Sequence, residues 1–79
     1  MIMKGYKVAS VIVEGCKTLQ VRRLNDGYLY SVLSMKLVEY STHLNTFGDV
    51  ERLCKMQFGD KSERLIVSIK QQLGDYATF

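Results

Sequence analysis

The residues best suited to nucleophilic or metal chemistry in this sequence are two cysteines, Cys16 and Cys54, and one histidine, His43. A cysteine nucleophile paired with a histidine also needs a group that orients the base and a donor for the oxyanion, and the sequence signals neither. A structural zinc site needs about four cysteine or histidine ligands at close spacing, whereas these three residues are scattered. The glycines are also scattered singly, so the sequence holds no phosphate-binding loop. We therefore expect a non-enzymatic protein without a metal or a cofactor.

The cysteines and the apolar residues together indicate a cytoplasmic protein without a membrane span. The N-terminal residues lack the apolar stretch of a secretory signal, so both thiols are expected to stay reduced. Cys54 occupies an apolar position of a predicted helix and is expected to be buried as a small hydrophobic residue, whereas Cys16 lies in a predicted turn. The longest uninterrupted apolar run is three residues, far short of the roughly 20 that cross a bilayer as a helix.

Basic residues in the first half of the chain are the second group of side chains that could bind a ligand, here the phosphates of a nucleic acid. The formal net charge of the 79 residues is +3, and all of this excess lies in the first half of the chain. Basic side chains beside tyrosines can follow a phosphate backbone and stack on bases, although the same charges also suit a solvated sheet face. The candidate nucleic-acid-binding residues are Lys7, Lys17, Arg22 and Arg23.

These residues depend on a predicted N-terminal β-hairpin. Residues 6–13 are rich in β-branched side chains, Gly15 suits a tight turn, and residues 18–24 alternate in polarity through Arg22. A two-residue loop would pair Glu14 with Lys17, Ile12 with Leu19 and Ser10 with Val21. That register places Tyr6, Val8, Ile12, Leu19 and Val21 on one face of the hairpin.

The pattern after Asn25-Asp26-Gly27 fits two structures. A third strand over 28–40 would complete a meander and place Leu29, Leu33 and Met35 on the face of Leu19 and Val21. Apolar residues between positions 29 and 44 also recur at helical spacing, without a glycine or proline. Because sixteen residues are long for a strand but ordinary for a helix, we favour a helix over 29–44.

The second half of the chain predicts two more helices. Thr46 and Asp49 have the spacing of an N-terminal capping box, and Gly59 is placed to end a helix. Ser62 is expected to cap a further helix that ends before Gly74, and a strand over 64–70 is the alternative. The fold class is therefore α+β within one small domain, residues 1–79: a β-hairpin, or a three-stranded antiparallel meander, packed on two or three short helices.

Residues 46–62 resemble a bacterial helix-turn-helix, in which two helices meet at an angle and the second enters the DNA major groove. The resemblance rests on Thr46 to Leu53, Met56, and Phe58 to Ser62. The sequence departs from the motif at Glu51, where a small residue usually packs between the helices, and at Lys55, where glycine usually makes the turn. The resemblance implies DNA binding by the C-terminal half.

The second face of the predicted hairpin suggests another function. Ala9, Val11 and Val13 lie opposite the face assigned to the core, and one helical layer covers only one face of a two-stranded sheet. We therefore expect a protein partner or a second copy to cover this face, with candidate residues Val11, Val13, Tyr28 and Tyr30. The alternative is that a third strand or the C-terminal segment 76–79 of the same chain covers it. The resulting hypothesis is a small interaction protein that acts as an inhibitor, adaptor or regulator. The alternative is a small basic nucleic-acid-binding regulator, and no small-molecule substrate is indicated.

Overall fold

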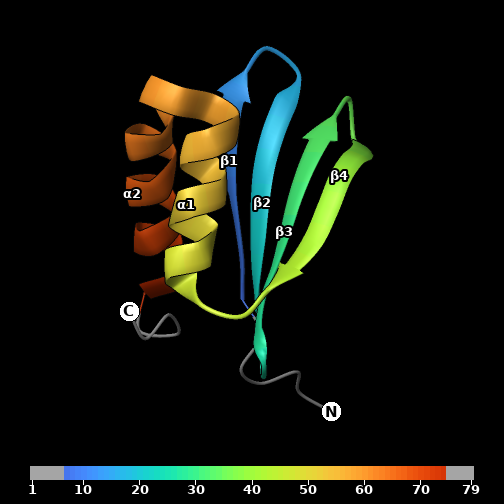
Figure 1. Ribbon diagram of the computed structural model, residues 1–79. Helices are drawn as coiled ribbons and strands as arrows, with labels where there is room; N and C mark the ends of the chain where they lie inside the picture. The colour runs from blue at the N-terminus through green and yellow to red at the C-terminus, as the bar shows by residue number, and fades with distance from the viewer. Residues whose placement is uncertain (1–6, 75–79) are drawn as a thin grey trace.

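The computed structural model of the chain describes residues 7–74 (Figure 1). Four consecutive strands form one antiparallel sheet in the order β1-β2-β3-β4, and a helical region follows them. The elements are β1 (Val8–Glu14), β2 (Lys17–Leu24), β3 (Gly27–Ser34), β4 (Leu37–Leu44), α1 (Phe47–Phe58), the short 3-10 helix η1 (Gly59–Lys61) and α2 (Ser62–Leu73). The class is α+β as predicted, but the sheet has four strands, so both the hairpin and the three-stranded meander are too small.

The predicted helix over 29–44 is wrong, because this stretch forms β3, a tight turn and β4. The turn consists of Met35 and Lys36, whose φ angles are 52° and 71°. Positive φ at both central residues is the geometry that joins two twisted strands through a two-residue loop. Asparagine, aspartate and glycine are the residues that usually adopt it, so Met-Lys gives no turn signal in the sequence.

The register of the first hairpin differs from the predicted one. Glu14 pairs with Lys17 as expected, but Val11 lies opposite Leu19 and Ala9 opposite Val21, because a bulge between Ile12 and Glu14 shifts the pairing. A shift of one residue exchanges the two faces of a strand. Val8 and Ile12 therefore lie on the face without helices, while Tyr6 and the segment 76–79 lie outside the described residues.

The β2–β3 connection also exchanges the faces of the predicted meander. Leu24 pairs with Gly27, so the loop contains Asn25 and Asp26 alone rather than three residues. As a result, Tyr30 and Val32 accompany Val21 and Leu19 on the covered face, in place of the expected Leu29, Leu33 and Met35.

The helical region covers one face of the sheet, where α1 and α2 lie side by side (Figure 1). The buried side chains of this two-layer core are Ala9, Val13, Leu19, Val21, Tyr28, Tyr30, Val32, Phe47, Val50, Cys54, Leu65, Ile69 and Leu73. Burying one apolar face of a sheet against the apolar stripes of helices is a common solution for an α+β domain.

The predicted ends of the helices agree closely with the structure. The Thr46 side chain accepts a hydrogen bond from the Asp49 amide at 3.2 Å and begins α1. Gly59 and Gly74, with φ angles of 57° and 56°, follow the ends of α1 and α2. Ser62 is the first residue of α2 and is buried, but its side chain makes no cap. The alternative strand over 64–70 is helical in the structure.

Candidate interaction surface

The residues predicted to bind a partner lie on the covered face of the sheet. Val13, Tyr28 and Tyr30 are buried, and Val11 packs against the core from a half-buried position. The Tyr30 hydroxyl donates a hydrogen bond to Gln57 Oε1 at 2.7 Å. The Tyr28 ring packs edge-on against the Phe47 ring, with 5.5 Å between the two ring centres. The bulge in β1 turned Val11 toward the helices, and the two-residue β2–β3 loop did the same for Tyr28 and Tyr30. Val13, Tyr28 and Tyr30 are therefore too buried to contact a partner, whereas Val11 is partly accessible.

The predicted nucleic-acid-binding residues do not form one patch. Lys17 and Arg23 lie on the helix side of β2, whereas Arg22 lies on the open side. Lys17 faces Glu39 at 3.8 Å, and the Arg23 guanidinium lies 5.2 Å from the Tyr28 ring centre and donates to the backbone carbonyls of Leu24 and Gly27. Lys7 and Arg22 are exposed, so the four positive charges are divided between two faces.

The two thiols and the histidine lie on different elements: Cys16 is exposed in the β1–β2 turn, Cys54 is buried in α1, and His43 belongs to β4. Burial raises the pKa of the Cys54 thiol to about 11, against a smaller lowering by the hydrogen-bonding interaction with the Tyr30 hydroxyl. Burial also raises the pKa of the Tyr30 hydroxyl. His43 lies on the open face beside Asp26, at 3.2 Å between Nε2 and Oδ1. Among residues 7–74, no group of three His, Cys, Asp or Glu residues is placed to hold a metal ion.

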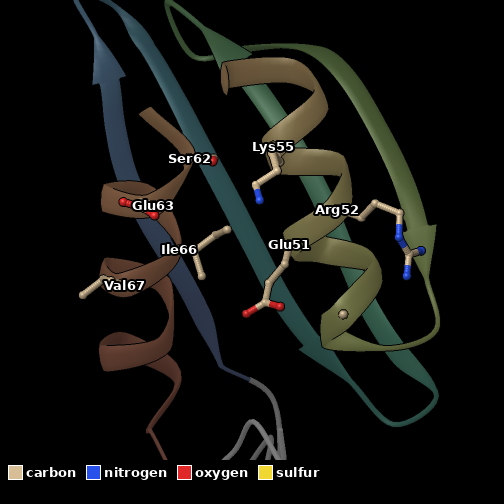
Figure 2. A pocket seen from close by; sticks show the side chains of 8 residues that line it. Glu51, Arg52, Lys55, Ser62, Glu63, Ile66 and Val67 are labelled. Atoms are coloured by element: carbon tan, nitrogen blue, oxygen red, sulfur yellow. The ribbon is translucent and has the colours of Figure 1, made fainter. Parts of the chain in front are cut away.

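A groove of about 600 Å³ runs between α1 and α2 on the outer side of the helical layer (Figure 2). Glu51 and Ile66 point into the space between the helices, while Glu63 and Val67 point outward. Glu51 is half-exposed, and its carboxylate forms an ion pair with Lys70 at 3.1 Å. It therefore does not occupy the closely packed position between two helices that a small residue holds in a helix-turn-helix. Acidic and basic side chains both line the groove, which gives it no single charge for a ligand.

The outer edge of β1 is closed by side chains of α2. Gln72 accepts a hydrogen bond from the Ser10 amide at 2.9 Å and donates one to the Ser10 carbonyl at 2.7 Å. The Arg64 guanidinium donates to the carbonyls of Ile12 and Val13 at 3.2 and 2.9 Å. These contacts occupy backbone groups that an added strand would need.

The opposite edge of the sheet, β4, is open in the sense that no other strand or helix of residues 7–74 pairs with its outer side. Figure 1 shows β4 on the side of the sheet away from α2, and all eight of its residues are exposed or half-exposed. Five of the exposed large apolar side chains gather at this strand, its turn and the adjoining side of α1: Met35, Leu37, Val38, Tyr40 and Met56. We call these five residues, together with the backbone of β4, the β4 edge.

The β4 edge was not predicted from the sequence, because its residues Met35, Leu37, Val38 and Tyr40 fall within the helix expected over 29–44. A signal was available: Val38 and Tyr40 are good strand residues that follow the three strand formers Tyr28, Tyr30 and Val32. Even a correct strand assignment leaves the edge unidentified, because its exposure depends on the strand order and on which edge α2 covers.

Comparison with protein-family models, with curated proteins and with solved structures gave no match. Within the described part of the chain, neither helix is long and apolar enough to cross a membrane. The interpretation of the molecule therefore depends on its own geometry.

Proposed function

We propose that this chain is a small non-enzymatic interaction module that binds a partner protein by adding a strand to the β4 edge. Strand addition uses main-chain hydrogen bonds for affinity and the alternating side chains for specificity. The observation that carries the proposal is the contrast between the two edges: α2 closes β1, and an apolar side-chain cluster surrounds an open β4.

The arrangement of the apolar residues supports this use of the edge. Leu37 and Tyr40 flank the strand on the helix side and Val38 lies on the open side, so apolar contacts are available on both faces of an added strand. Exposed apolar side chains that gather in one place mark interaction surfaces, whereas scattered ones are ordinary. Val67 on α2, which is also exposed, is such a scattered residue.

Site-specific photo-crosslinking tests the proposal. A photoreactive residue at position 37 is expected to give adducts heavier than one chain in the cells that make the protein, because Leu37 lies in the β4 edge. The same residue at position 67 is the matched control, since Val67 is similarly exposed on α2 but far from β4. Adducts at position 67 alone, or at neither position, would refute binding at the β4 edge.

A further inference from the structure

We propose that the partner at the β4 edge is a second copy of this chain, paired antiparallel through β4 about a two-fold axis at Thr42. This inference rests on the function proposed above and identifies its partner. The product is a dimer with one continuous eight-stranded sheet, in which the two β4 strands lie at the centre.

The closed β1 edge determines where such pairing stops. A dimer joined through its two β4 strands has a β1 strand at each outer edge, and α2 occupies the backbone of both. An isologous two-fold interface uses the same surface on both copies and leaves nothing to extend. The fold therefore permits one round of strand addition between copies and blocks growth into longer sheets.

The hydrogen-bond pattern of the sheet determines which β4 groups face outward. The Arg23 amide donates to the Lys7 carbonyl at 2.8 Å, so odd-numbered residues of β2 face β1. Because the bonding direction alternates along antiparallel strands, Tyr28 and Tyr30 of β3 face their pairing partners Leu44 and Thr42 in β4. The backbone groups of Ser41 and His43 then point away from the sheet.

A bulge limits the usable register. The pairing of β3 with β4 shifts between Val32 and Leu33, which leaves Glu39 as an extra residue and disturbs β4 before Tyr40. The regular run is Tyr40 to Leu44, and its midpoint is Thr42. An axis at Thr42 places Ser41 of each copy opposite His43 of the other, which pairs the outward-facing backbone groups. An axis at Ser41 would instead place His43 opposite Glu39, at the bulge.

The side chains complement one another in this register. On the helix side, Tyr40 of each copy lies opposite Leu44 of the other, and the two Thr42 side chains meet at the axis; aromatic–aliphatic and Thr–Thr pairs favour antiparallel strands. Met56, which belongs to α1, lies beside the β4 residues Tyr40, Thr42 and Leu44. It is positioned to cover the pair formed by Tyr40 of one copy and Leu44 of the other.

The charges near the two ends of the regular run are compensated within each copy. Glu39 lies at the N-terminal end of the regular run of β4, on the helix side, where it faces Lys17 at 3.8 Å. The exposed Arg52 of α1 points away from α2 (Figure 2) and adjoins Thr42 and Leu44 near the other end of the strand. Glu39 is paired with Lys17, and Arg52 is paired with Asp49 at 2.8 Å, so each end of the regular run carries both signs of charge and neither end presents an excess of one sign to the second copy.

The test uses charge exchange at the axis, measured by sedimentation velocity over a concentration series up to about 1 mM. The unmodified chain is expected to reach twice the mass of one chain. Thr42→Asp and Thr42→Lys each place like charges opposite one another and are expected to weaken the dimer roughly tenfold or more. An equimolar mixture of the two variants is expected to recover the doubled mass, because the axis then pairs opposite charges.

Further variants separate loss of fold from loss of pairing. Ser41→Pro removes an outward amide that the β3–β4 ladder does not use and is expected to give a folded monomer by circular dichroism, while Val67→Lys is expected to leave the dimer intact. A single-chain mass at every concentration for the unmodified chain would overturn the inference. If position 37 then crosslinks to a protein of another mass, the proposed function stands; if it gives no adduct, both fail. Equal weakening without recovery in the mixture would overturn the axis at Thr42.

Discussion

At the scale of single residues, Gly27 is the position where side-chain size and backbone conformation are most tightly restricted. Its φ angle is 142°, and a Cβ atom there would lie 2.2 Å from the carbonyl oxygen of Leu44. The close approach lets the β2–β3 loop lie against the end of β4. Gly15 also has a positive φ, 55°, but nothing lies within 4 Å of its Cβ position, so it offers a matched comparison.

We expect Gly27→Ala to lower the free energy of unfolding by about 2–5 kcal/mol, because it adds a backbone clash to an unfavourable conformation. Gly15→Ala is expected to cost about 1–2 kcal/mol, from the conformation alone. Urea unfolding of both variants measures the difference. Equal losses would show that the contact with Leu44 relaxes without cost.

At the scale of elements, the sequence predicted what depends on local chemistry. The ends of α1 follow from Thr46, Asp49 and Gly59, because each capping interaction joins residues no more than four positions apart: Thr46 with Asp49, and Gly59 with Lys55. The alternative meander also located the second strand and the start of the third, although the strand proposed over 28–40 covers β3, a turn and part of β4. Two features were not predicted: the bulge that reversed the faces of β1, and the Met35-Lys36 turn. Both are backbone conformations imposed by tertiary packing rather than preferred by their residues.

The β4 edge was out of reach for the same reason. Strand propensity at Val38 and Tyr40 says nothing about which strand is last in the sheet, and the closing residue Gln72 is 62 positions from its partner Ser10. The candidate residues Val11 and Tyr30 were chosen on the assumption of a two-stranded sheet, and the two additional strands and the helical region changed which faces are covered.

The turn between β3 and β4 offers a test at this scale. Met35→Asn combined with Lys36→Gly is expected to raise the free energy of unfolding by about 1–2 kcal/mol, because both new residues tolerate positive φ better. Lys36→Ala is the control, since alanine retains the Cβ atom and should give no comparable gain. The urea midpoint at an unchanged m-value is the measurement. A loss of stability in the double variant would contradict the assigned turn geometry.

At the scale of the whole molecule, the closed edge of β1 protects the sheet against uncontrolled association. Gln72→Ala removes two hydrogen bonds to the Ser10 backbone and is expected to lower the free energy of unfolding by about 1–3 kcal/mol. It also re-opens an edge, so light scattering is expected to detect assemblies larger than those of the unmodified chain. Gln71→Ala, one position earlier on the exposed side of α2, is the control. Equal scattering from both variants would mean that Gln72 does not guard the edge.

The order of the elements along the chain determines when, during synthesis, the edge of β1 becomes covered by α2. β1 precedes the side chain that satisfies its backbone by 62 positions, so during synthesis the first strand leaves the ribosome well before its cover. Domains with many contacts between distant segments also fold slowly, and unpaired strand edges are aggregation-prone in partly folded chains. The risk of aggregation through β1 is therefore highest during synthesis, between the emergence of β1 and the docking of α2. A chain that stalls or ends before α2 keeps the β1 edge exposed.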